Sequence, residues 1–149
     1  MKSIFNKNDN AELIERIKKL NSETQGLWGK MNVGQMLKHV RVPLQLMNGS
    51  KQIKFTLLGF FFGKTLMKKY FKDRGFGKNL PTHTEFRVVD KKEFESEQKE
   101  LIHILQQFLE KGPSSVTKNK HPFFGHMSAE QWDDMMYLHL NHHLQQFGV

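Results

Sequence analysis

Residues 128–147 constrain the fold of this chain most strongly, because both ends of a helix are marked in them. Ser128 and Gln131 have the spacing of a capping box, and Gly148 is a suitable residue just beyond a helix C-terminus. Helical spacing gathers apolar side chains on one broad face: Trp132, Met135, Met136, Leu140 and Phe147. The segment is therefore predicted to form an amphipathic helix.

Two histidines lie near the middle of that apolar face. His139 and His143 are one turn apart, so their imidazoles project the same way and can share one metal ion. His142 lies toward the edge of the face. Histidine pairs at this spacing also occur as packed core residues, so the pattern leaves two interpretations open, buried side chains or metal ligands.

A third histidine occupies the same kind of position in residues 32–47. His39 lies at the centre of an apolar stripe with these neighbours on the helical wheel: Gln35, Met36, Pro43, Leu46 and Met47. If this helix packs face to face with the last one, His39, His139 and His143 could converge. Three neutral imidazoles leave a fourth position open for water or substrate, which is the pattern of catalytic rather than structural zinc.

Several motifs resemble those of the DinB-like (DinB/YfiT-like) superfamily, in the expected order. The segments that carry the resemblance are Trp28–His39, Asn79–Thr82, His121–Gly125, His139–His143 and His142–Gly148. The more specific similarity is to an uncharacterised, domain-of-unknown-function branch of that superfamily. The resemblance implies a small four-helix bundle with a three-histidine metal site, assigns the ligand positions to His39, His139 and His143, and is compatible with a homodimer.

Hydrophobic periodicity predicts two more helices. The first has an apolar stripe of Leu13, Ile14, Ile17 and Leu20, with Asn8, Asp9 or Asn10 as its N-cap. The other contains Phe94, Leu101, Ile102, Leu105, Phe108 and Leu109 and ends at Gly112-Pro113. Pro43 predicts a bend in the helix that carries His39, the alternative being that this helix ends sooner.

These elements predict an all-α fold, a single domain over residues 1–149. Four principal helices are expected near 10–24, 32–48, 91–111 and 128–147, packed as a four-helix bundle of the DinB-like type. A basic, aromatic-rich crossover over about 51–78 is expected to join the second and third helices. Residues 82–89 read as an extended segment too isolated to imply a sheet.

The crossover concentrates the positive charge of a chain whose net charge is +8. Eight lysines and arginines between residues 51 and 78 are accompanied by one acid, Asp73. An anionic membrane surface, nucleic acid or an acidic substrate could use such a surface. No nucleic-acid-binding motif accompanies the charge, and lysine stems commonly cover apolar surface. A packed crossover with a solvated basic face, and no specific nucleic-acid partner, is the preferred interpretation.

Composition limits the chemistry and the compartment. The chain has no cysteine, which excludes disulfides, cysteine zinc sites and a thiol nucleophile of its own. Residues 1–10 lack the apolar core of a signal peptide. The longest strongly apolar run, 55–63, is far shorter than the roughly 20 residues that span a bilayer. A cytoplasmic protein without a transmembrane segment is expected.

Ligating histidines usually have an orienting partner, and three residues are candidates for contacts around the metal. These are Gln35, one turn before His39, His142 beside the ligand pair, and His121 in the His-Pro-Phe-Phe-Gly turn. The other interpretation of that turn is structural, with its two phenylalanines covering one end of the bundle. His83, His103 and His126 are expected to have no metal role.

The functional prediction is a metal-dependent enzyme that acts on a small-molecule substrate. A divalent ion (Zn, Ni or Fe) would activate water, as in a hydrolase, or a low-molecular-weight thiol, as in the thiol S-transferases that the resemblance suggests. Catalytic residues are not identified, because Asp133 and Asp134 point away from the histidine face and Glu85 is in a loop. The alternatives are a non-catalytic bundle with structural or vestigial histidines, and a protein whose basic stretch docks on an acidic surface.

Overall fold

The structure is a computed structural model that describes residues 2–53, 65 and 93–149. Its principal elements are the helices α1 (Lys7–Lys18), α2 (Val33–Met47), α4 (Phe94–Lys111) and α5 (Ala129–Gln146), with a 3-10 helix η2 (Gly112–Ser115) directly after α4. No strand is present in these ranges. Most of the predicted crossover, and the predicted extended segment 82–89, lie outside the described residues. The predicted all-α class is confirmed.

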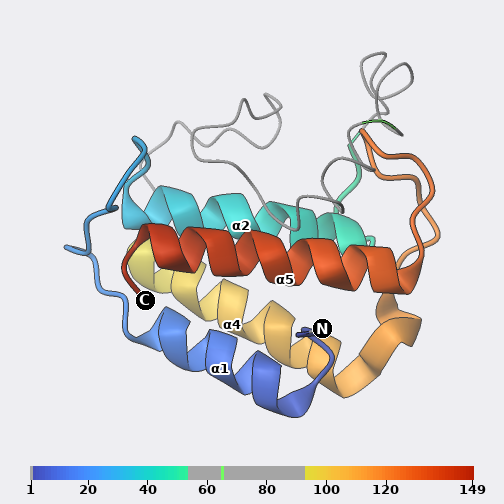
Figure 1. The fold of residues 1–149 in the computed structure, drawn as a ribbon, viewed down its shortest axis with the longest axis horizontal. Helices are drawn as coiled ribbons and strands as arrows, with labels where there is room; N and C mark the ends of the chain where they lie inside the picture. The colour runs from blue at the N-terminus through green and yellow to red at the C-terminus, as the bar shows by residue number, and fades with distance from the viewer. Residues whose placement is uncertain (1, 54–64, 66–92) are drawn as a thin grey trace.

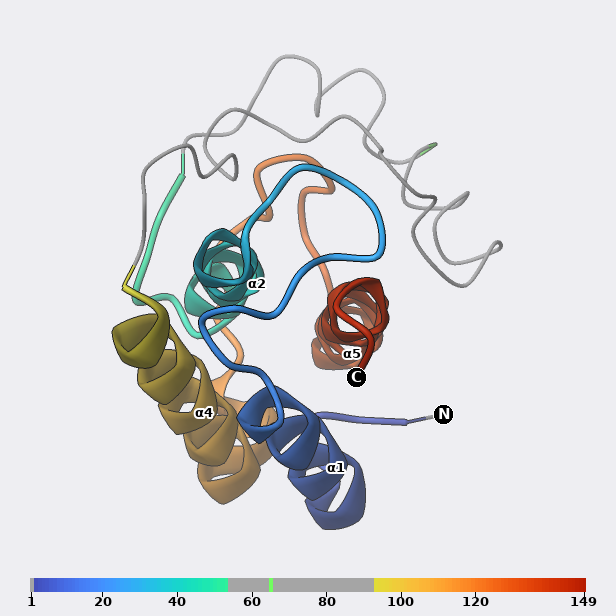
Figure 2. The same ribbon diagram turned by 90° about the vertical axis from the view of Figure 1, so that its left-hand side faces the viewer.

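The four helices form a bundle in which each packs against two neighbours. Around the bundle the order is α1, α4, α2 and α5, and α5 closes the ring against α1. Figure 2 shows this arrangement end-on, with α2 and α5 together on one side and α1 and α4 on the other. In Figure 1, α2 and α5 lie side by side and run in opposite directions. The predicted face-to-face packing of the two histidine-bearing helices is therefore present.

The apolar stripes predicted from periodicity form the core. Leu13 and Ile17 of α1, Leu101 and Leu105 of α4, and Met36 of α2 are fully enclosed. Trp132 in the first half of α5 is also buried. Burying these side chains stabilises each helix against its neighbours, which matters because isolated helices of this length are marginal in water.

The start of α1 differs from the prediction. The N-cap is Asn6, whose side-chain oxygen accepts hydrogen bonds from the backbone N–H groups of Asn8 and Asp9. Asn10, one of the three predicted caps, is instead buried and donates to the carbonyls of Ile4 and Leu105. The helix therefore begins earlier than predicted, and it ends at Lys18 rather than near residue 24. Several asparagines in a row offer equivalent caps, and tertiary contacts select among them.

Helix α2 continues through its proline. A capping box between Asn32 and Gln35 starts the helix, and the helical residues run past Pro43 to Met47. The alternative of an earlier end is wrong, whereas the bend at Pro43 stays a prediction. The continuous helix keeps His39 on the same rigid element as the core residues on either side of it.

An ion pair joins α2 to α4 inside the bundle. Arg41 Nε donates to Glu97 Oε2 at 3.0 Å, and a terminal guanidinium nitrogen lies 2.9 Å from the same oxygen. Lys38 Nζ lies 3.8 Å from the other carboxylate oxygen. Both Arg41 and Glu97 are buried, so this pair was not apparent from the amphipathic pattern, which places charges outside.

None of the helices in the described residues combines the length and the apolar character that crossing a membrane requires.

Candidate metal centre

Three imidazoles from two helices meet inside the bundle. His39 comes from α2, and His139 and His143 come from successive turns of α5. Their ring centroids are separated by 5.0 Å for His39 and His139, and by 4.8 Å for each of the other two pairs. One ring nitrogen from each histidine lies within 4.8 Å of the other two. The predicted convergence of His39, His139 and His143 is present.

The surroundings of the three rings favour the neutral imidazole. His39 and His139 are 7% exposed and His143 is 8% exposed. Burial lowers the pKa of His139 well below its ordinary value, and charge on the neighbouring imidazoles lowers it further. Burial is also the main cause that lowers the pKa of His143 to about 3. Neutral imidazole is the form that binds a metal ion.

The spacing of the rings is compatible with a shared cation and with a direct hydrogen bond between two of them. Nε2 of His39 and Nε2 of His139 lie 3.1 Å apart. Zinc–nitrogen bonds of about 2.0–2.1 Å in a tetrahedral site put two ligand nitrogens roughly 3.3 Å apart. Without a metal ion, only one of these two facing nitrogens can carry hydrogen and donate to the other. The three residues therefore fit a divalent ion in their chemistry, their protonation and their spacing.

Gln146 supplies an orienting hydrogen bond that the sequence analysis missed. Its Oε1 lies 2.7 Å from Nδ1 of His143, and its Nε2 donates to the carbonyl oxygen of Trp28 at 2.6 Å. The signal was present in the sequence, since residues three apart on a helix are neighbours. Residue 146 follows His143 closely enough to reach back to it.

Gln35 and His142, which were predicted to lie next to a bound metal ion, differ in the groups that they contact. Gln35 accepts a hydrogen bond from the backbone N–H of Asn32 with its side-chain oxygen, as part of the α2 capping box. The His142 ring lies edge-on to His143, with centroids 5.0 Å apart, and edge-on to Trp28 at 5.9 Å. Roles for Gln35 and His142 next to a metal stay predictions.

His121 is part of a tight turn rather than of the histidine cluster. Its Nδ1 accepts hydrogen bonds from the backbone N–H groups of Phe123 and Phe124, both at 3.1 Å. Its backbone pairs with Gly125, and its ring stacks on Phe124 with centroids 4.6 Å apart. Burial lowers the pKa of His121 to about 3. The structural interpretation of this turn is therefore supported.

The other titratable candidates lie away from the three histidines or outside the described ranges. His103 and His126 are exposed, and Glu85 and His83 are not among the described residues. Asp133 accepts a hydrogen bond from the backbone N–H of Ile4 at 2.8 Å, and burial raises the pKa of its carboxyl. This aspartate fastens the N-terminal segment to α5, as expected for a carboxylate that points away from the histidine face.

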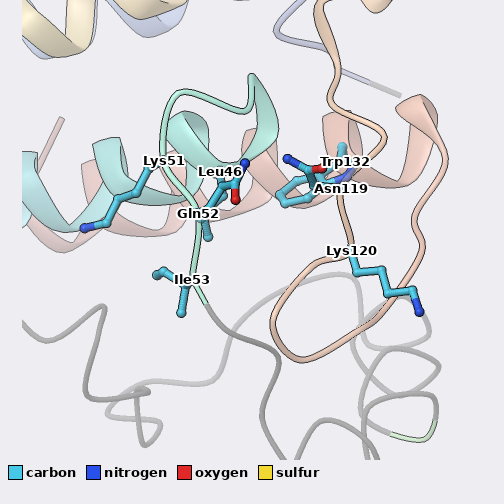
Figure 3. A pocket seen from close by; sticks show the side chains of 7 residues that line it. All are labelled: Leu46, Lys51, Gln52, Ile53, Asn119, Lys120 and Trp132. Atoms are coloured by element: carbon cyan, nitrogen blue, oxygen red, sulfur yellow. The ribbon is translucent and has the colours of Figure 1, made fainter.

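A pocket of about 200 Å³ lies farther along the contact between α2 and α5. Its lining residues are Leu46, Lys51, Gln52, Ile53, Asn119, Lys120 and Trp132. Figure 3 shows Trp132 and Asn119 on one side of it and Leu46 and Gln52 on the other. Leu46 is seven residues after His39, and Trp132 is seven before His139, so the pocket is roughly 10 Å from the histidines. The pocket and the histidine cluster are separate features of one helix–helix contact.

Comparison with known proteins identifies a family. No curated protein matches the chain, and no solved structure matches it either. Residues 3–148 match the family described as "Protein of unknown function (DUF1569)". That range includes the helices α1, α2, α4 and α5 and the three clustered histidines. The protein belongs to the DUF1569 family of proteins of unknown function.

Proposed function

We propose that this protein binds a divalent metal ion through His39, His139 and His143 and uses it in an enzymatic reaction. The observation that carries the proposal is the cluster of three buried imidazoles, with ligand atoms within 4.8 Å of one another, on two helices of a rigid bundle. The resemblance to the DinB-like superfamily supports the same ligand set.

Burial requires that the polar nitrogens of the three rings have partners inside the bundle. Each imidazole brings polar nitrogens into the core, where hydrogen bonds or a metal ion must offset the loss of water. A neutral imidazole offers one N–H and one lone pair, so facing rings can also share a hydrogen bond, and this is the structural alternative. A shared cation would take a lone pair from all three rings at once, and the convergence of three ligand atoms supports metal binding.

The chemical class follows from what such a site supplies. A divalent ion held by three neutral imidazoles keeps its charge and lowers the pKa of a coordinated water or thiol. The protein would hold the ligands in place through α2 and α5 and keep the surroundings largely free of bulk water. A hydrolase or a thiol S-transferase that uses a low-molecular-weight thiol fits this chemistry. A small-molecule substrate, a cytoplasmic location and a homodimer also remain predictions.

Elemental analysis of the purified, tag-free protein tests the proposal. We expect about one equivalent of zinc, nickel or iron per chain. The His139→Ala variant should lose the metal and keep its helical circular dichroism. The His103→Ala variant, which truncates an exposed histidine on α4, should keep the metal. If the parent takes up no divalent ion even after reloading, the histidines are core residues and the metalloenzyme is excluded.

The same variants separate an enzyme from a non-catalytic bundle with a structural metal. A structural site contributes folding free energy, so the metal-free parent and His139→Ala should both be strongly destabilised relative to the metal-bound parent. A catalytic site should leave the metal-free parent and His139→Ala both folded, with midpoints only modestly below that of the metal-bound parent. Thermal unfolding of both proteins with and without chelator gives the comparison.

A further inference from the structure

A chain of hydrogen bonds sets the proton position on His143. Gln146 Nε2 donates to the Trp28 carbonyl, and Gln146 Oε1 faces Nδ1 of His143. A backbone carbonyl only accepts hydrogen bonds, so it holds the amide with its NH₂ group toward Trp28 and its oxygen toward His143. An amide oxygen also only accepts. Nδ1 of His143 must therefore carry the hydrogen and donate it to Gln146.

This proton position leaves the other ring nitrogen available as a ligand. A neutral imidazole has one N–H and one lone pair, and His143 is only 8% exposed. With hydrogen on Nδ1, the lone pair is on Nε2. Gln146 is itself 3% exposed, so water does not compete for the amide and the tautomer is well defined.

The same glutamine holds a surface segment. The backbone N–H of Leu27 donates to the backbone oxygen of Gln146 at 2.7 Å, in addition to the side-chain bond to Trp28. The Leu27 side chain is 71% exposed, so this segment reaches the surface while its backbone is attached to α5. One residue thus contacts both a proposed metal ligand and residues 27 and 28.

We propose that Gln146 is a positioning residue that couples metal occupancy to the ordering of residues 27 and 28. This inference rests on the proposed metal site. A cation on Nε2 makes the Nδ1–H of His143 a stronger donor, which polarises the Gln146 amide and strengthens its bond to Trp28. Because coupling between binding and order is reciprocal, loosening residues 27 and 28 must weaken metal affinity by the same factor.

The first test needs neither a variant nor a metal. Long-range ¹H–¹⁵N spectra of the metal-free parent, with His143 assigned, report which ring nitrogen carries hydrogen. The expected result is the Nδ1–H tautomer. A predominant Nε2–H tautomer would overturn the proposal. If the parent has the expected tautomer but takes up no zinc, the proposed function and the coupling both fail, and only the hydrogen-bond chain stands.

Two substitutions at position 146 test the amide oxygen, which accepts from His143, separately from the amide NH₂ group, which donates to Trp28. Gln146→Met removes both and should weaken zinc binding roughly 10- to 100-fold, the usual effect of losing an orienting partner. Gln146→Glu keeps an oxygen for Nδ1–H but has no donor for Trp28. It should therefore bind zinc much more tightly than Gln146→Met does. Gln145→Met, at the adjacent exposed position, should bind zinc like the parent. Equal zinc affinity in Gln146→Met and the parent contradicts a positioning role.

Hydrogen exchange at the Leu27 amide measures the coupling. In the parent, saturating zinc should slow this exchange roughly fivefold or more. In Gln146→Glu the exchange should be faster than in the parent and should respond little to zinc, because the bond to Trp28 is lost. No effect of zinc on Leu27 exchange in a parent that binds zinc would show that the two features are independent and overturn the coupling.

Discussion

Glu97→Leu is expected to lower the free energy of unfolding by roughly 3 to 5 kcal/mol, the usual cost of removing one partner of a buried ion pair. Arg41 is 7% exposed, and its Nε and a terminal guanidinium nitrogen both contact Glu97 Oε2, at 3.0 and 2.9 Å. Arginine stays protonated in proteins, so the variant would leave an unpaired charge between α2 and α4. Urea denaturation of the variant and the parent measures the loss.

A double variant distinguishes the unpaired charge from lost packing. Arg41→Met combined with Glu97→Leu removes both charges, and apolar replacement of a buried pair is often neutral or stabilising. We expect the double variant to recover most of the loss. Glu95→Leu makes the same substitution at an exposed position of the same helical turn, and it should change stability by less than about 0.5 kcal/mol. If the double variant is as unstable as Glu97→Leu, lost packing rather than charge explains the effect.

His121 should make the protein sensitive to acid. Its native pKa is about 3, because burial disfavours the charged ring, whereas an unfolded histidine titrates near pH 6.5. The unfolded chain therefore binds the proton first as the pH falls. The stability due to neutral His121 is complete above about pH 6.5 and decreases by about 1.4 kcal/mol per pH unit down toward pH 3. Lowering the pH from 7.5 to 4.5 should cost about 3 kcal/mol at this residue alone.

His121→Asn tests this contribution directly. The asparagine oxygen can accept from the backbone N–H groups of Phe123 and Phe124 as an Asx turn does, but it does not titrate. The variant should lose about 1 to 2 kcal/mol at pH 7.5 from lost ring packing, and it should lose less stability than the parent on acidification. Urea denaturation with chelator at both pH values gives the comparison. His126→Asn, at an exposed position nearby, should follow the parent, and parallel curves for parent and His121→Asn would contradict the assignment.

The described helices were largely predictable because their signals are local. The capping boxes at Asn32 and Ser128, and the apolar stripes between helix ends, depend on residues within a few positions of one another. The start of α1 was less predictable, because Asn6, Asn8, Asp9 and Asn10 are all good caps. Burial of Asn10 against Leu105, which is distant in sequence, decided between them.

The three clustered histidines were predictable from the sequence, whereas the hydrogen bond that orients His143 was not. His39, His139 and His143 each lie at the centre of an apolar stripe, so burial of the stripes brings them together. Helical position does not show which polar group faces a buried ring. The orienting bond from Gln146 depends on where the backbone carbonyl of Trp28 lies, and that position is set by the packing of a nonhelical segment against α5.

The sequence by itself determined the all-α class, the four described helices and the three histidines, because each depends on short-range periodicity and on which faces must leave water. Only the tertiary structure decided that Arg41 and Glu97 pair inside the bundle, that His121 supports a turn, and that Gln146 contacts His143. These contacts depend on the distance and orientation of groups from separate segments, and residue spacing along one helix carries no information about either.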